Sequence, residues 1–287
     1  MSTEGICWIN NAIVPLDEAR ISVMDHGLLY GDGIFEGIRF YSNRAFLLDK
    51  HLKRLMASAK AIALKLPYSI IELNEVIQSV IDSYGQPQGY LRLIVTRGTG
   101  SLGINPAQCN RPALIVIASP LLMSNEQDQS RGIRTIIAST RRIPADCLSP
   151  QIKSLNYLNS ILARIEANQA GVEEALMLNQ QGFVAEGTAD NVFIVKNETL
   201  YTPPAIDGAL AGITRELIIE LATDAGIKTH EKTLAAYDIY TADECFLSGT
   251  GAELIPVREV DGRTLADCPG DVFTRISALF QDYTYAC

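Results

Sequence analysis

Apolar and polar positions along the first half of the chain follow two periods. Alternation with a period of two flanks Asn10-Asn11 and Ser42-Asn43, which predicts β-hairpins over residues 6–17 and 33–49. Apolar residues three or four positions apart predict helices over 49–64 and 70–85. Two further apolar stretches, 90–98 and 113–120, predict buried strands. We therefore expect an antiparallel sheet with helices.

A polar and irregular stretch, 120–131, then interrupts these patterns. Beyond it, the pattern predicts strands, two hairpins and four helices. The strands span 132–140, 244–250 and 255–262, the hairpins 173–188 and 191–203, and the helices 156–170, 213–226, 234–242 and 271–283. Both halves mix helix and strand, so we predict an α+β protein with an N-terminal domain (1–119), a linker (120–131) and a C-terminal domain (132–287).

Composition and charge narrow the function. The 287 residues are 47% hydrophobic and 20% charged, which is typical of a packed domain. The net charge of −9 and the lack of a Lys/Arg run argue against a nucleic-acid partner. We also expect no membrane span, no secretion signal and a cytoplasmic location. Three histidines and six scattered cysteines, without a C-x-x-C pair, favour free thiols and no metal site.

Lys153 stands between apolar residues just before a predicted helix. Leu155, Leu158, Ile161, Leu162 and Ile165 recur at helical spacing, so we expect the helix to bury this face and to hold the lysine near rigid structure. On composition alone, a lysine with its amine in solvent is the simpler interpretation. The alternative is a partly desolvated amine of the kind that forms Schiff bases with carbonyl groups.

Other segments of the C-terminal half offer the partners that a pyridoxal phosphate site would need. Glu186 follows an alternating strand and precedes a glycine, so its carboxylate could project into a cleft. Residues 212–214 open a helix, and 248–251 follow a strand, so backbone N–H groups at both places could bind a phosphate. Each signal is weak alone. The G-x-G-x-x-G match at 98–103 is set aside because Pro106 follows it and no helix opens there.

Taken in order, the segments resemble the fold-type IV pyridoxal-phosphate enzymes, and most closely the branched-chain amino acid aminotransferases. The resemblance extends over nearly the whole chain. It is carried by MDHGLLYGDGIFEGIRFY, DKHLKRLMASAKAI, YLRLIVTRGTGSLGINP, IKSLNYLNSILARIEA, EALMLNQQGFVAEGTADNVFIV, LAGITRELIIELA and YTADECFLSGTGAELIPV. It implies a D-amino-acid aminotransferase-like fold, with a small N-terminal α/β sandwich and a larger C-terminal pseudo-barrel domain.

The resemblance also implies pyridoxal 5′-phosphate as cofactor and a role for each matching residue. Lys153 is the catalytic lysine that carries the cofactor and moves the proton. Glu186 keeps the pyridine nitrogen protonated, Tyr157 contacts the phenolic oxygen, and Arg54 binds the phosphate. The remaining cofactor-binding residues that it implies are Leu210, Gly212, Ile213, Thr214, Ser248, Gly249 and Thr250.

On the substrate side, the resemblance implies transamination of L-leucine, L-isoleucine or L-valine with 2-oxoglutarate. The residues implied are Tyr30, Phe35, Gly37, Arg39, Tyr90, Arg92, Thr250 and Gly251. Arg92 is the candidate partner for the second carboxylate of glutamate. Loop 98–106 and Tyr30 are expected to reach a neighbouring subunit, which implies a homodimer at least, with a trimer of dimers as a larger alternative.

Two alternatives remain open at this point. The first is another reaction of the same fold: a D-amino-acid or amine transaminase, or an aminodeoxychorismate lyase. The short Lys-Ser-Leu-Asn-Tyr stretch, 153–157, also occurs in D-amino-acid transaminases, although the Phe-Glu-Gly-Ile-Arg stretch, 35–39, favours the branched-chain group. The second is a non-catalytic binding protein in which Lys153 is a surface lysine.

Overall fold

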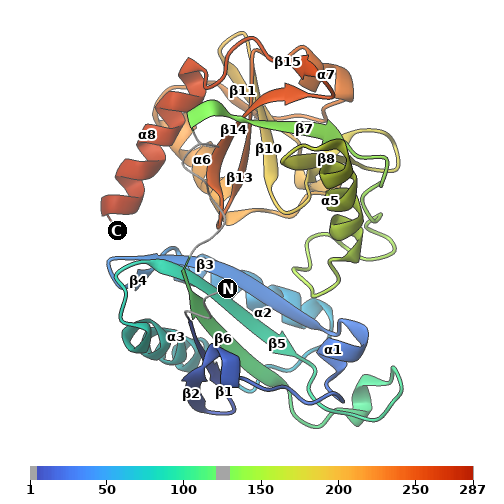
Figure 1. Ribbon diagram of the computed structural model, residues 1–287, viewed down its shortest axis with the longest axis vertical. Helices are drawn as coiled ribbons and strands as arrows, with labels where there is room; N and C mark the ends of the chain where they lie inside the picture. Colours follow the sequence, from blue (N-terminus) through green and yellow to red (C-terminus); the bar gives the residue numbers. More distant parts are fainter. Residues whose placement is uncertain (1–4, 121–129, 287) are drawn as a thin grey trace. The chain divides into compact units, whose positions relative to one another are not determined.

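The computed structural model describes residues 5–120 and 130–286, which form two compact units (Figure 1). Among these residues, the first unit comprises 5–120 with Ile152–Asn156, and the second comprises 130–151 with 157–286. Most of the predicted linker, 121–129, lies outside the described residues. The exact domain boundaries therefore stay a prediction.

The first unit contains the predicted antiparallel sheet. Its strand order is β2-β1-β6-β5-β3-β4. The strands are β1 (Ile6–Ile9), β2 (Ala12–Pro15), β3 (Gly33–Tyr41), β4 (Arg44–Ala45), β5 (Gly89–Thr96) and β6 (Ala113–Ser119). Both predicted hairpins are confirmed. Asn10 and Asn11, like Ser42 and Asn43, have positive φ angles of 48° to 63°, the left-handed conformation that a two-residue hairpin turn requires.

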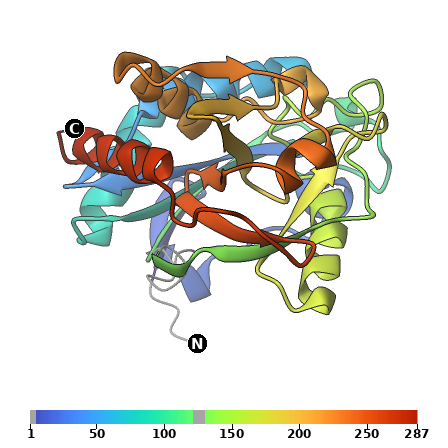
Figure 2. The ribbon, with the colours of Figure 1, turned by 90° about the horizontal axis from the view of Figure 1, so that it is seen from above.

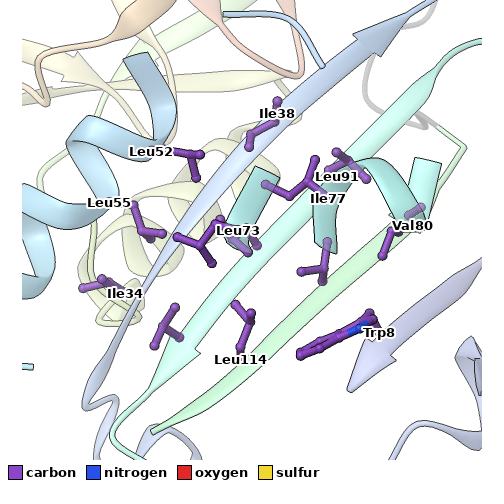
Figure 3. Packing of buried hydrophobic residues seen from close by; sticks show 14 of the residues in the cluster. Trp8, Ile34, Ile38, Leu52, Leu55, Leu73, Ile77, Val80, Leu91 and Leu114 are labelled. Atoms are coloured by element: carbon purple, nitrogen blue, oxygen red, sulfur yellow. The ribbon is translucent and has the colours of Figure 1, made fainter. Parts of the chain in front are cut away.

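Helices cover one face of this sheet and form its core. They are α2 (Leu48–Ala61) and α3 (Ile70–Tyr84), and a short helix, α1 (His26–Tyr30), precedes β3. A capping box between Ser69 and Glu72 begins α3, and Gly85 in the left-handed conformation ends it. Figure 3 shows how side chains from both helices pack against Ile34 and Ile38 of β3. The inward positions of β3 are therefore fixed by packing.

The segment Ile152–Asn156 packs with the first unit, although the sequence analysis assigned these residues to the C-terminal domain. Phe35 N donates to Lys153 O (2.9 Å), and Leu155 N donates to Gly33 O (3.0 Å). Ile34 and Ser154 form an antiparallel bridge. Periodicity could not reveal this, because the pairing joins residues about 120 positions apart.

The second unit contains a nine-stranded sheet with order β12-β11-β10-β13-β14-β7-β8-β9, and β15 pairs with β14. Its strands are β7 (Ile133–Ile137), β8 (Glu174–Leu178), β9 (Val184–Gly187), β10 (Asn191–Lys196), β11 (Thr199–Thr202), β12 (Thr229–Glu231), β13 (Glu244–Gly249), β14 (Glu253–Val260) and β15 (Arg263–Thr264). The two predicted hairpins are confirmed, but three strand pairs are parallel: β7 with β8, β7 with β14, and β11 with β12. Figure 2 shows β7 beside β14. Parallel neighbours need crossover connections, which α5 and α6 supply.

The helices of this unit are α5 (Leu158–Ala170), α6 (Ile213–Asp224), α7 (Ala236–Tyr240) and α8 (Asp271–Ala286). The prediction for α5 is wrong in one respect. Its buried residues are the small ones, Ser160, Ala163 and Ala167, because the helix lies close to β8. The large apolar residues that we expected to be buried, Leu158, Ile161, Leu162 and Ile165, are 43% to 67% exposed in the single chain.

Two searches of the described residues found nothing. None of their helices is both long enough and apolar enough to cross a membrane. Within residues 5–120 and 130–286, no group of three or more His, Cys, Asp or Glu side chains could hold a metal ion.

Candidate active site

Lys153 is held against the edge of β3 in the first unit. Besides its backbone bond to Phe35, its own N–H donates to Ser58 Oγ at 3.3 Å. The side chain is half-buried, and Nζ lies 4.8 Å from the centroid of the Phe35 ring. The amine therefore sits over an aromatic face beside rigid structure rather than on a mobile loop.

The predicted substrate residues of β3 and β5 share one face of the sheet. Gly37 pairs with Arg92, and Arg39 pairs with Tyr90, so these four positions and Phe35 lie opposite the apolar core. The Arg92 guanidinium lies 4.5 Å from the Phe35 ring centroid and 5.5 Å from that of Tyr90. A Cβ on Gly37 would collide with Tyr90 Oη, so only glycine allows this approach.

Tyr30 lies apart from this group, on α1. Its ring packs edge-on against His26, with centroids 5.0 Å apart, and it is 39% exposed. His26 Nε2 in turn lies 2.9 Å from Ser101 O in loop 98–106. Tyr30 and that loop are therefore connected through one histidine, as the resemblance grouped them.

Arg54 on α2 forms a bidentate pair with Glu36 of β3. Arg54 Nε donates to Glu36 Oε1 at 2.8 Å and Nη2 donates to Oε2 at 2.7 Å. His51 Nδ1 lies 2.8 Å from Glu36 Oε2. Burial would raise the pKa of Glu36, but the hydrogen bonds and charges of Arg54 and His51 outweigh it and lower this pKa to about 2. Burial lowers the pKa of His51, so its ring is neutral near pH 7 and donates from Nδ1.

Glu186 is buried at β9 in the second unit and engages three partners. Arg142 Nη2 lies 2.5 Å from Glu186 Oε1. The Leu210 backbone N–H and Asn191 Nδ2 donate to Oε2 at 3.0 and 3.3 Å. Arg142 is itself held by Gly208 O, to which its Nε donates at 3.2 Å. This carboxylate is therefore ion-paired and fixed in orientation, as a hydrogen-bond acceptor for a ring N–H should be.

The N-terminus of α6 lies next to this carboxylate through Asn191. A Cβ on Gly212, the residue that begins the helix, would collide with Asn191 Oδ1. No described side chain caps α6. The backbone N–H groups of Ile213 and Thr214 thus form the start of a 12-residue helix, where an anion is favoured.

The turn after β13 supplies a further polar group. Ser248 is 1% exposed, and its Oγ has no hydrogen-bond partner among the described residues. A Cβ on Gly249 would collide with Asp190 Oδ1, which keeps the backbone close-packed where Thr250 and Gly251 follow. A buried hydroxyl without a partner and an uncapped helix start fit a ligand that carries a phosphate and other polar atoms.

Comparison with known proteins follows from this geometry. Residues 33–260 match the family model for amino-transferase class IV. This chain belongs to the class IV aminotransferase family. A protein of Methanocaldococcus jannaschii is 46% identical over 276 residues, which cover 96% of this chain and 95% of that relative.

Solved structures agree with this assignment. The Escherichia coli branched-chain amino acid aminotransferase has a TM-score of 0.93 and 35% identity, over 96% of this chain and 93% of that one. Another branched-chain amino acid aminotransferase, from T.th. and complexed with N-(5′-phosphopyridoxyl)-L-glutamate, has a TM-score of 0.91 and 36% identity, over 98% and 94%. The predicted fold of a class IV aminotransferase is confirmed, and this family uses pyridoxal 5′-phosphate.

The structure thus divides the predicted site residues of this class IV aminotransferase between two sets. Each unit brings its own members together, and Tyr157 begins α5, where its carbonyl accepts the Ile161 N–H at 2.9 Å. Four residues in contact with these sets were not predicted: Glu36, His51, Arg142 and Asn191. Alternation in β3 could have flagged Glu36, a carboxylate at an inward position, but no local pattern marks the other three.

Proposed function

We propose that this class IV aminotransferase transfers the amino group of L-leucine, L-isoleucine or L-valine to 2-oxoglutarate, with pyridoxal 5′-phosphate as cofactor. The observation that carries the proposal is the group formed by Phe35, Lys153 and Arg92. It offers an aromatic surface for an apolar side chain, an amine for the chemistry, and a cation for the second carboxylate of glutamate. The names of the solved relatives agree with this substrate class.

Both sets of residues have roles toward the cofactor in this proposal. Arg54, the N–H groups of Ile213 and Thr214, and Thr250 bind the phosphate. Glu186 accepts a hydrogen bond from the ring nitrogen, and Arg142 keeps that carboxylate ionised. When bound, pyridoxal phosphate draws electrons from the substrate carbon that carries the amino group and makes its proton acidic.

Lys153 and the residues of the β3–β5 face act on the substrate. The amine of Lys153 holds the cofactor covalently in the resting enzyme and, once released, takes the proton from the substrate α carbon. The backbone amides of Thr250 and Gly251 bind the α-carboxylate. Phe35 contacts the branched side chain and Arg92 binds the second carboxylate of glutamate, so one face serves both substrates.

Lys153→Ala tests this proposal. We expect loss of turnover with L-leucine and 2-oxoglutarate, and loss of the borohydride-trapped adduct with pyridoxal phosphate. Lys60→Ala, which removes an exposed lysine of α2, is the matched control and should keep both. Full activity in Lys153→Ala would contradict the mechanism. A panel of L-leucine, L-valine, D-alanine and a chiral amine tests the substrate class, and a preference for D-alanine or the amine would overturn it.

We further propose that two copies associate through the exposed apolar face of α5. Leu158, Ile161, Leu162 and Ile165 form a contiguous helical stripe, and a stripe of this kind is normally covered in solution. Ile161→Glu should convert the dimer to monomer in analytical ultracentrifugation. Ile206→Glu, at an isolated position that is 85% exposed, should leave the dimer intact. A stable Ile161→Glu dimer would contradict this interface, and a wild-type hexamer would indicate a trimer of dimers.

The loop 98–106 is proposed to face the second copy as well. Leu102 and Ile104 are 75% and 83% exposed in the single chain. Two large apolar side chains at the tip of a polar loop favour contact with another surface. We also propose a cytoplasmic location, which the exposed free thiol of Cys147 supports because such thiols persist in reducing compartments.

A further inference from the structure

Glu36 occupies a position in β3 that packing would assign to an apolar residue. Ile34 and Ile38, two positions before and after it, belong to the hydrophobic core of the first unit, together with Leu52 and Leu55 of α2 (Figure 3). Side chains two apart in a strand point to the same face, so Glu36 points toward α2. It is 0% exposed. An ionised carboxylate in such a place is costly unless it is paired and hydrogen-bonded.

Two residues of α2 supply that pairing. His51 and Arg54 are three positions apart, so they lie on the same side of the helix. Glu36 Oε2 accepts hydrogen bonds from both His51 Nδ1 and Arg54 Nη2, and Oε1 accepts one from Arg54 Nε. His51 is 1% exposed, and the Arg54 side chain is 13% exposed. The three side chains form one buried network, here called the Glu36 cluster.

Stability alone does not account for this cluster. A buried ion pair is often no more stabilising than apolar residues of similar volume, because the charged groups lose their hydration. What the cluster does provide is orientation. The guanidinium is planar, and Glu36 binds its Nε–Nη2 edge, so the direction of Nη1 is fixed by the same two bonds. His51 in turn fixes the carboxylate.

We infer that Glu36 and His51 are positioning residues, which hold the guanidinium of Arg54 in the orientation that binds the phosphate of the cofactor. This inference rests on the proposed function, which assigns Arg54 to that phosphate. Neither residue contacts the cofactor in this account, since both act through Arg54. The neutral state of His51 is consistent with it, because the cluster then carries one negative and one positive charge before phosphate binds.

The test measures the affinity of apoenzyme variants for pyridoxal phosphate and for pyridoxal, which lacks the phosphate. The readout is the ratio of the two dissociation constants, because a general loss of structure lowers both affinities, whereas misorientation of Arg54 lowers only the first. His51→Leu removes the donor to Glu36. His51→Asn retains a donor at the position of Nδ1 and serves as the rescue variant. Glu36→Gln removes the charge that binds Arg54.

A matched control comes from another bidentate pair in the same unit. Arg97 Nε and Nη2 donate to Asp32 at 2.9 Å, and the remaining guanidinium donors bond to the carbonyls of Ala63 and Ile62. Asp32→Asn therefore breaks an ion pair of similar geometry whose arginine is engaged by backbone. It should lower thermal stability without changing the preference for pyridoxal phosphate over pyridoxal.

We expect His51→Leu and Glu36→Gln to lower that preference by about 10- to 100-fold, the usual effect of losing a partner that orients a ligand-binding group. His51→Asn should stay within about threefold of wild type. An unchanged preference in both His51→Leu and Glu36→Gln, with a loss in Arg54→Gln, would overturn the inference and leave the proposed function intact. An unchanged preference in Arg54→Gln would overturn both the inference and the assignment of Arg54. An apoenzyme that binds no pyridoxal phosphate would overturn the proposed function itself.

Discussion

The ionisation of Glu36 makes a quantitative prediction about stability and pH. Its pKa falls from the ordinary value of 4.5 to about 2 in the folded chain. At about 1.4 kcal/mol per pH unit, this lowering corresponds to about 3 kcal/mol of unfolding free energy. Because Glu36 is 0% exposed, solvent screening does not reduce the figure. A group whose folded pKa is lowered contributes fully above its unfolded pKa, and the contribution disappears as the pH falls through the folded pKa.

The perturbation is Glu36→Gln, which removes the titrating group and leaves Arg54 without its counterion. We expect the variant to be less stable than wild type by about 3 kcal/mol at pH 7, close to what breaking a buried ion pair costs. The difference should shrink between pH 4.5 and about 2, because wild-type Glu36 becomes protonated there and also loses its charge.

Urea unfolding of the apoenzyme at several pH values measures this difference. Trp8, the single tryptophan, packs in the same hydrophobic core as Ile34 and Ile38, so its fluorescence reports unfolding around Glu36. The matched control is Glu72→Gln at the exposed capping box of α3, for which we expect a change below about 1 kcal/mol. A stability difference for Glu36→Gln that does not vary between pH 7 and pH 3 would refute the reasoning.

Two further predictions concern the site. Arg142→Met should lower kcat/KM by about 10- to 100-fold, because Glu186 loses its ion pair, whereas Arg142→Lys should lose less; equal activity of all three forms would contradict a role for the pair. Gly37→Ala should raise KM for L-leucine about tenfold, because the new methyl group displaces Tyr90, while the unfolding free energy should change by no more than about 1 kcal/mol; an unchanged KM would show that Tyr90 does not define the substrate site.

Local patterns predicted most helices and strands correctly, for reasons that lie within a few residues. Asn10-Asn11 and Ser42-Asn43 tolerate the left-handed conformation, so two hairpins could be placed from the chain alone. The α5 helix could also be placed, but its buried face could not. Periodicity identifies an apolar stripe, yet it does not say whether that stripe packs inside the chain or on another surface, and here small residues face β8 instead.

The candidate site shows the same division. Lys153, Glu186 and the start of α6 could be proposed from the sequence because each belongs to a local motif, and their order along the chain resembled one family. The partners that set the charge and orientation of these groups could not, because Arg142 lies 44 positions before Glu186, and Glu36 lies 18 before Arg54. Local sequence determined the elements and the reactive residue types. Tertiary structure alone decided which charges meet, because an ion pair depends on distance in space, and only the folded chain fixes that distance.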